Sequence, residues 1–351
     1  MPKATVAGPL VSDEMVVFSV PDDERELARV ALVHELVRPR VVPFERVGNR
    51  FELRLKRPPV DRLEYVLARE LRNGSTDVGL DPANDLVAPG PLGAKSVVEF
   101  PEYEPPGWVD DTESEPGEIR DLVLPSSLLR TKVTAKLWSA AETDPGQPLP
   151  LLVVHDGPEY AEYSSLVRLL DHLVAFGELP PLRAALIPPP LDRFETYSAA
   201  ARYGRALTEE WLPALPATTG RPVGLGASLG ALALLHAHYA KRGCFGGLVL
   251  QSGSFFRRRF DAHESRFGRF ARITRFVGQV HGRRGFAARV PTTITCGVAE
   301  ENLENNRALA AALLRRGWDV STFWNHDAHN WIAWRDAMHP YLAELLLRAW
   351  T

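Results

Sequence analysis

The sequence of 351 residues has only two cysteines, Cys244 and Cys296, and both lie beside apolar segments expected to form core strands. Two buried thiols are more typical of a reducing compartment than of a disulfide-stabilised secreted protein. The histidines, acids and cysteines also lack the spacing of metal ligands, so we expect no metal site and no cofactor.

Long apolar runs and an excess of one charge are missing as well. No stretch approaches the ~18 apolar residues of a membrane span, and the first residues lack the apolar core of a secretory signal. We therefore expect a cytoplasmic protein. Its 41 basic and 44 acidic side chains give a net charge of −3, which predicts no nucleic-acid or membrane partner. The oligomeric state stays open.

What the sequence does contain is enough apolar material for two domains: 45% of the residues are hydrophobic and 24% are charged. In residues 1–105, alternating runs such as Arg50–Lys56 and Ser96–Phe100 are separated by proline and Asn-Gly breaks. This pattern predicts a β-sandwich domain. Residues 106–117 are rich in proline and acids and predict an extended linker, which leaves 118–351 as a second domain.

The second domain alternates strands with helices, which is typical of a mainly parallel sheet covered on both faces. The expected strands are Val133–Trp138, Leu151–His155, Arg183–Ile187, Val223–Leu225, Gly247–Gln251, Thr292–Cys296 and Val320–Trp324. The expected helices are Ser164–Phe176, Tyr197–Leu215, Leu229–Lys241 and Leu303–Arg316. The predicted fold class is therefore α/β.

One of these strands runs into Gly226-Ala227-Ser228-Leu229-Gly230, which is followed by an uninterrupted helix. This G-x-S-x-G pattern between strand and helix predicts a nucleophile elbow, in which a sharp turn exposes the serine hydroxyl. The small residues on either side let neighbouring backbones pass close to the turn. We therefore expect Ser228 to be a catalytic nucleophile.

A serine nucleophile needs a histidine base and an acid that orients it. In α/β-hydrolases these follow the serine in the order acid, then histidine. Glu300 and Glu301 follow the strand that ends at Cys296, and we prefer Glu300 because it is nearer to the strand end. His326 and His329 both follow the last strand, and the sequence order alone does not separate them.

The oxyanion of an acyl transfer needs two backbone donors. Leu229, directly after the nucleophile, supplies one of them. The second is expected from the loop after Leu151–Val154. Gly157 is the preferred donor, and the other amides up to Tyr160, except that of Pro158, are candidates. The alternative is that this loop is an ordinary Asp-Gly turn.

These residues together resemble the enterochelin esterase family of α/β-hydrolases, which is related to feruloyl esterases and to antigen 85-type mycolyltransferases. The matching stretches are Val153–Gly157, Glu178–Pro181, Arg193–Glu195, Glu210–Pro213, Gly226–Gly230, Gln251–Phe255, Gly297–Leu309 and His329–Arg335. Counting back from Trp334-Arg335, the resemblance places the base on His329. The chain departs from the family pattern there, because Asp327-Ala328 replaces two glycines and Asn330 replaces an aspartate.

The resemblance implies an α/β-hydrolase domain preceded by an immunoglobulin-like β-sandwich, and a serine esterase with a Ser-His-Glu triad of Ser228, His329 and Glu300. It also implies a catecholate siderophore ester of the enterobactin kind as the substrate, which would release iron on hydrolysis. Arg193, Glu195 and Tyr160 are expected to contact this substrate. Alternatives are a feruloyl, acetyl or other carbohydrate-linked ester, or a non-catalytic binding protein on the same scaffold.

A basic segment could select such a substrate. Residues 257–289 hold ten arginines against Asp261 and Glu264, interleaved with phenylalanines. A solvated helical face is one interpretation, and a cleft for an anionic ferric siderophore is the other, because guanidinium groups suit anionic ligands. On the second interpretation, Arg257, Arg258 and Phe255 contact the substrate.

Overall fold

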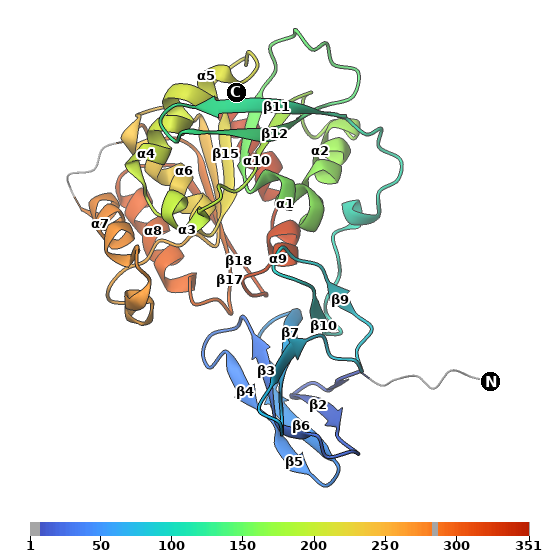
Figure 1. Ribbon diagram of the computed structural model, residues 1–351. Helices are drawn as coiled ribbons and strands as arrows, with labels where there is room; N and C mark the ends of the chain where they lie inside the picture. The colour runs from blue at the N-terminus through green and yellow to red at the C-terminus, as the bar shows by residue number, and fades with distance from the viewer. Residues whose placement is uncertain (1–7, 283–286, 351) are drawn as a thin grey trace. The chain divides into compact units, whose positions relative to one another are not determined.

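The described residues, 8–282 and 287–350 of the computed structural model, fall into two structural units (Figure 1). Unit 1 comprises the chain up to Glu104 together with Gly297–Glu301 and His326–Ala333. Unit 2 comprises Pro105–Cys296, Asn302–Asn325 and the chain from Trp334 onward. The sequence indicated a boundary near 105, but it did not indicate that two later segments belong with the first unit.

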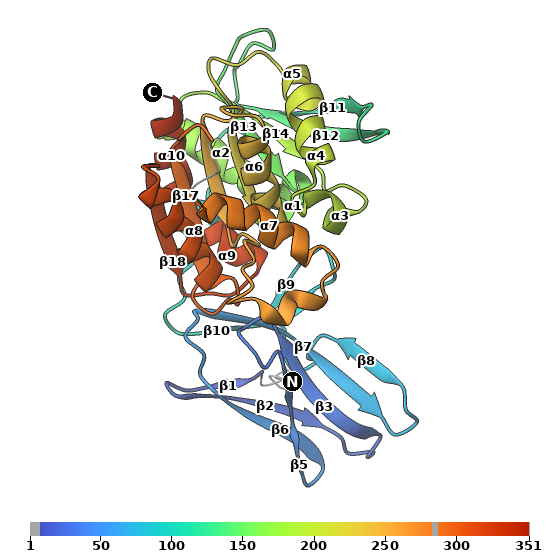
Figure 2. The same ribbon diagram turned by 90° about the vertical axis from the view of Figure 1, so that its left-hand side faces the viewer.

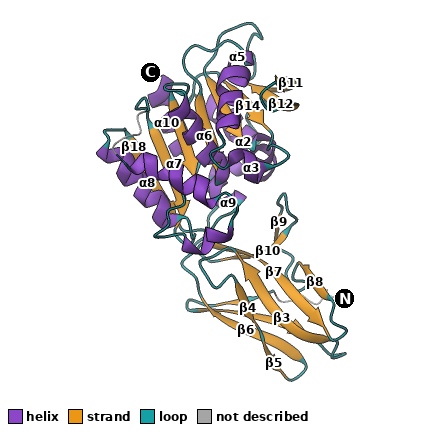
Figure 3. Ribbon diagram, turned by 60° about the vertical axis from the view of Figure 1, so that its left-hand side comes forward, coloured by secondary structure: helices purple, strands orange, loops and turns teal. Residues whose placement is uncertain are grey.

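Unit 1 is built on two antiparallel sheets, drawn mainly as strands and loops in Figure 3. One sheet has the order β1-β2-β6-β5, and the other has the order β4-β3-β7-β10-β9 with β8 paired to β7. The strands are β1 (Leu10–Val11), β2 (Met15–Pro21), β3 (Leu27–His34), β4 (Val41–Pro43), β5 (Glu45–Val47), β6 (Arg50–Lys56), β7 (Arg62–Leu71), β8 (Thr76–Gly79), β9 (Val87–Ala88) and β10 (Lys95–Glu99).

The core of unit 1 follows from the alternating pattern of these strands. In β2, Val16 and Phe18 are fully buried while their neighbours are partly exposed, as expected for a strand with one face on a core. Phe18 packs edge-on against Tyr65 of β7, with ring centroids 5.0 Å apart, and so joins the two sheets. The same core includes Ala299 and Ala328 from the two later segments.

Unit 2 is organised around an eight-stranded sheet of order β11-β12-β14-β13-β15-β16-β17-β18. Strands β14, β13, β15, β16 and β17 pair in parallel, whereas β11 and β12 form an antiparallel edge. The bounds are β11 (Glu118–Ser126), β12 (Thr131–Ser139), β13 (Leu151–His155), β14 (Arg183–Ile187), β15 (Val223–Ala227), β16 (Gly247–Gln251), β17 (Thr292–Gly297) and β18 (Val320–Asn325). This order, with one antiparallel strand inserted, is that of the α/β-hydrolase fold.

Helices cover both faces of this sheet. Their bounds are α1 (Gly157–Tyr163), α2 (Leu166–Ala175), α3 (Arg193–Tyr197), α4 (Ala201–Arg205), α5 (Leu212–Ala214), α6 (Leu229–Ala240), α7 (Phe270–His281), α8 (Leu303–Arg315), α9 (Trp331–Asp336) and α10 (Tyr341–Trp350). Neighbouring residues of β16 show the two layers, since Gly247 faces Leu345 of α10 and Leu248 meets α6 near Leu234. In Figure 2, α6 and α7 lie in front of the sheet and α2 lies behind it.

Several expected elements differ from those observed. The helix predicted over 197–215 is broken, because Ala199 has a positive φ of 54° and the chain then forms α4, a π-helical turn over Ala206–Trp211 and α5. The predicted linker is not extended: His172 of α2 bonds the Asp111 carboxylate at 2.8 Å, and Trp108 is buried. In unit 2, strand β11 and helices α1, α3, α7, α9 and α10 were not predicted.

Candidate active site

Ser228 occupies the turn between β15 and α6 with φ 53° and ψ −122°. A positive φ is costly for a residue with a side chain, by about 1–3 kcal/mol, and it persists only where the surroundings enforce it. Gly226 is part of that enforcement, since a Cβ there would lie 2.9 Å from the carbonyl carbon of Gly230. The turn therefore has the strained geometry of a nucleophile elbow.

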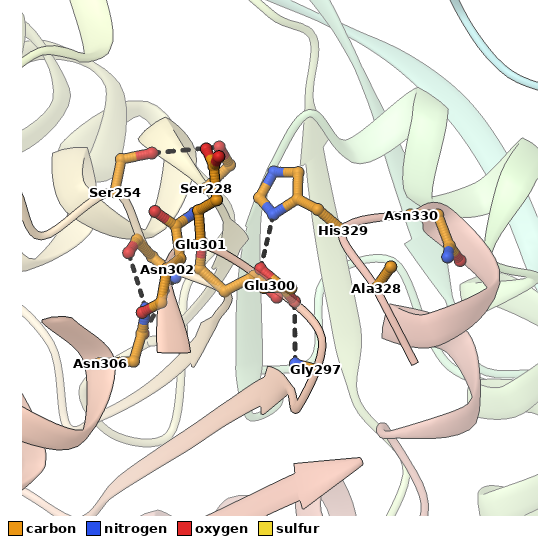
Figure 4. A network of polar contacts seen from close by, with 12 residues as sticks. Ser228, Ser254, Gly297, Glu300, Glu301, Asn302, Asn306, Ala328, His329 and Asn330 are labelled. Carbon is orange, nitrogen blue, oxygen red and sulfur yellow. Dashed lines mark hydrogen bonds and ion pairs between the residues drawn. The ribbon is translucent and has the colours of Figure 1, made fainter. Parts of the chain in front are cut away.

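The strand next to the elbow fixes this turn. The Ser228 amide donates to the Gln251 carbonyl at 2.9 Å, and the Ser254 amide donates to the Ser228 carbonyl at 3.1 Å. The hydroxyls of Ser228 and Ser254 are 3.2 Å apart (Figure 4). Ser254 was not singled out from the sequence as a partner of Ser228, although it lies in the Gln251–Phe255 stretch.

Two helices begin at the carboxyl ends of the neighbouring parallel strands β13 and β15. Gly157 opens α1 and Leu229 opens α6. Amides in the first turn of a helix have no acceptor within that helix and are turned toward its N-terminal end. Gly157 and Leu229 therefore lie at helix starts, and their role as oxyanion donors stays a prediction. The Asp-Gly segment begins a helix rather than forming a simple turn.

His155 ties these two helix starts together. Its Nδ1 lies 3.0 Å from the Gly230 carbonyl and its Nε2 lies 2.8 Å from the Tyr203 hydroxyl. Burial lowers the pKa of His155 to about 4, so the ring is neutral near pH 7. Because the carbonyl can only accept, Nδ1 carries the proton and Nε2 accepts from Tyr203. From the sequence, only the position of His155 at a strand end could have indicated this role.

The expected acid and base form a pair in unit 1. Nδ1 of His329 lies 2.8 Å from Oε2 of Glu300, and Oε1 of Glu300 accepts from the Gly297 amide at 2.8 Å (Figure 4). The Glu300 side chain is 1% exposed, while His329 is 30% exposed. Nδ1 of His329 thus makes the contact with a carboxylate that a triad histidine makes with its acid, and the catalytic role of the pair stays a prediction.

The two alternative candidates have other partners. Glu301 pairs with Arg38 at 2.9 Å and with Arg40 at 2.6 Å. His326 is 70% exposed and lies 3.9 Å from the Asp61 carboxylate. Within unit 1, the contact that a triad needs is therefore made by Glu300 and His329.

Several of the residues predicted to contact the substrate have protein partners or are buried. Phe255 and Tyr160 are fully buried, and the Tyr160 hydroxyl donates to Gln251 at 2.8 Å. Both side chains lie in the protein interior, and substrate contact by them stays a prediction. Arg193 clasps the Asp156 carboxylate, with its Nη2 at 2.7 Å from Oδ2.

Two arginines of the basic segment pair with Glu195: Arg269, and Arg272 at 2.7 Å. Arg257 is half-buried with its guanidinium 5.7 Å from the Phe260 ring, and Arg258 is exposed. Arg283 and Arg284 of the same segment lie outside the described residues. Direct substrate contact by Arg193, Glu195, Arg257 and Arg258 stays a prediction.

The sheet order and the strained serine between β15 and α6 define an α/β-hydrolase-fold protein with an N-terminal region of two antiparallel sheets. The chain is 27% identical over 308 residues to the iron(III) enterobactin esterase of Escherichia coli O6:H1, covering 82% of this chain and 72% of that protein. The chain is thus similar in sequence to an enterobactin esterase over most of its length.

Solved structures of two such esterases match almost the whole chain. The ferric enterobactin esterase of Salmonella typhimurium is 20% identical with a TM-score of 0.77, covering 99% of this chain and 97% of that one. The enterobactin esterase of Shigella flexneri, crystallised in the presence of enterobactin, is 22% identical with a TM-score of 0.72, covering 98% and 96%. No family model matches the sequence. Among residues 8–282 and 287–350, no helix is long and apolar enough to cross a membrane.

Proposed function

We propose that this chain is a serine esterase that hydrolyses the ester bonds of a catecholate siderophore of the enterobactin kind. The observation that carries the proposal is a strained elbow serine followed, after β17 and β18, by a hydrogen-bonded Glu300–His329 pair. This is the chain order of an α/β-hydrolase triad. The similarity to an iron(III) enterobactin esterase over 82% of the chain supports the substrate class.

In the proposed reaction, the Ser228 hydroxyl attacks the ester carbonyl while Nε2 of His329 takes its proton. The amides of Leu229 and Gly157 stabilise the oxyanion. The tetrahedral intermediate then collapses, the C–O bond breaks, and His329 returns the proton to the leaving alcohol. Water, deprotonated by the same histidine, releases the acyl group and regenerates Ser228, while Glu300 keeps the ring oriented throughout.

Replacing the nucleophile tests the chemistry. Ser228→Ala should lower kcat for p-nitrophenyl butyrate by at least about 1000-fold, because no other group can form the acyl-enzyme. Thermal unfolding should remain cooperative, since the exchange only deletes a hydroxyl. As a matched control, Ser254→Ala removes the neighbouring hydroxyl and should retain most of the activity. Turnover by Ser228→Ala at the wild-type rate would refute the proposal.

The substrate class needs a separate comparison. Purified protein should cleave enterobactin and its ferric complex, measured as release of dihydroxybenzoyl-serine by chromatography, far faster than methyl ferulate. The reverse preference would point to a plant-type phenolic ester. Failure of a fluorophosphonate to label Ser228 would favour a binding protein on this scaffold. The cytoplasmic location stays a prediction, which cell fractionation can check.

A further inference from the structure

The segment that carries Glu300 is held by residues of the β-sandwich. Oε1 and Oε2 of Glu301 pair with Arg38 and Arg40 respectively, and the Glu301 side chain is only 11% exposed. One residue before Glu300, the Ala299 carbonyl accepts from the Val37 amide at 2.9 Å. The residues on both sides of Glu300 are therefore bonded to the loop over 37–40.

Packing adds to these bonds. Ala299 is 3% exposed and belongs to the hydrophobic core of the β-sandwich. A backbone hydrogen bond and a buried methyl group thus restrain Ala299, and two ion pairs restrain Glu301, on either side of Glu300. The Arg38 and Arg40 side chains are 59% and 48% exposed, so water partly screens their pairs, but the Glu301 carboxylate that they share is shielded.

The segment that carries His329 is held by the same domain. The Asp61 amide donates to the His326 carbonyl at 2.6 Å, and Ala328 lies in the core of the sandwich with 6% of its surface exposed. Oδ1 of Asp327 accepts from the Ala328 amide at 2.7 Å and from Nδ2 of Asn330 at 2.9 Å. These bonds lie on both sides of His329.

The two segments also bind each other. The Ala299 amide donates to the Asp327 carbonyl at 3.2 Å. Gly297 permits this approach, since a Cβ there would lie 2.3 Å from the Asp327 oxygen. The Glu300–His329 hydrogen bond is therefore set between two segments that are fixed to one another and to the sandwich.

We propose that Arg38 and Arg40 of the β-sandwich, acting through Glu301, are positioning residues for the Glu300–His329 pair. The inference rests on the proposed function, in which this pair activates Ser228. A general base works only when its ring is held within a fraction of an ångström and a few degrees of the productive position. The first domain would then govern the rate of the chemical step for every ester, including esters too small to need recognition.

Point variants of the full-length chain test this with p-nitrophenyl butyrate, a substrate without catechol rings. Glu301→Gln removes both ion pairs and preserves the shape of the side chain, and Arg38→Gln/Arg40→Gln removes them from the other side. We expect each to lower kcat on the order of 10-fold with KM changed less than twofold. Arg38→Lys/Arg40→Lys keeps the charges and should recover part of the loss.

The matched control is Arg29→Gln/Glu70→Gln, which removes a 3.5 Å ion pair of the same domain whose arginine side chain is 82% exposed. It should leave kcat and KM unchanged. A second readout is the downfield proton signal of His329 Nδ1, assigned by its loss in His329→Gln. This signal should shift or broaden in Glu301→Gln and stay in place in the control.

The proposal is overturned if Glu301→Gln and Arg38→Gln/Arg40→Gln retain wild-type kcat per folded molecule, or lose stability alone. The proton signal also separates it from the proposed function. If the wild-type protein cleaves no ester but its proton signal changes in Glu301→Gln, the positioning role stands and the proposed esterase function is refuted. If the wild-type protein is active but neither its signal nor its kcat changes in the two variants, the esterase function stands and the positioning role is refuted.

Discussion

Asp327 lies two residues before the proposed base, His329, in the same segment. The enterochelin esterase pattern has a glycine at this position. Asp327 is 5% exposed, and burial raises the pKa of its carboxyl to about 7, with the Arg62 guanidinium offsetting only part of that effect. Its Oδ1 bonds Asn330, which replaces the family's aspartate. The two residues that depart from the motif are therefore hydrogen-bonded to each other. The sequence alone could not show this bond, because it shows only two separate substitutions.

Asp327→Asn should remove a pH dependence of stability from unit 1. The folded pKa of about 7 lies above the ordinary 3.8, so the folded state binds the extra proton between these values. The resulting stabilisation is present at low pH and is lost as pH rises through 7, about 2–3 kcal/mol between pH 5 and 8.

Asparagine keeps the acceptor oxygen and carries no charge, so the free energy of unfolding should change less over this range. Hydrogen exchange of the amides in β2 and β7, followed from pH 5 to 8 after correction for intrinsic rates, measures the difference. Parallel curves for the two proteins would contradict the expectation.

Among the elements, those predicted best are short apolar runs with a clear stop. Leu151–His155 was predicted at the observed bounds of β13, and the helices after the elbow and after Asn302 end within one residue of the predicted positions. The break in the helix predicted over 197–215 was missed, because it occurs at a positive φ of Ala199 that no residue type in the sequence signals. The partners of Glu301 were also beyond prediction, since Arg38 lies 263 residues away in the chain.

At this scale, Gly297→Ala should force apart the segments that carry the proposed acid and base. The new methyl group would meet the Asp327 carbonyl, a backbone atom that cannot turn aside. We expect a loss of about 1–3 kcal/mol of stability and a fall in kcat of at least about 10-fold. Activity assays and urea unfolding measure both effects.

Gly278→Ala is the control for this substitution. Gly278 lies inside α7, and a Cβ there meets nothing within 4 Å. Alanine should therefore stabilise the helix by about 0.5–1 kcal/mol and leave kcat unchanged. A Gly297→Ala enzyme as active as the wild type would show that the close approach of the two segments is not needed.

For the whole molecule, the sequence predicted two domains and a boundary near residue 105, but not the return of two segments to unit 1. Local patterns report burial and periodicity, and these segments carry too few apolar residues to register. Ala299 and Ala328 contribute one methyl group each to the sandwich core. Their place in unit 1 depends on contacts with residues far away in the chain, so it cannot be predicted from a local stretch of sequence.

Unit 2 should lose stability in acid through its buried histidines. Burial lowers the pKa of His155 and of His236 to about 4, below the ordinary 6.5, so unfolding takes up protons between these values. Stability is then full above pH 6.5 and is lost as pH falls toward 4, by up to about 1.4 kcal/mol per pH unit for each histidine.

His236→Phe removes one of these groups and keeps a ring against Phe276, whose centroid lies 4.9 Å away. The difference in unfolding free energy between pH 7 and pH 5 should shrink by about 2 kcal/mol, measured by urea denaturation. An unchanged difference would mean that His236 has the same pKa in the folded and the unfolded protein.

The chain passes between the two units five times, because Gly297–Glu301 and His326–Ala333 return to unit 1. Exchanging the β-sandwich by cutting only at the linker would therefore leave two segments of unit 1 behind. A hybrid with the first 104 residues of a relative would inherit the partners of those two segments from one parent and the segments from the other. A hybrid that keeps these contacts must take the sandwich and both segments from the same parent, as three separate stretches of sequence.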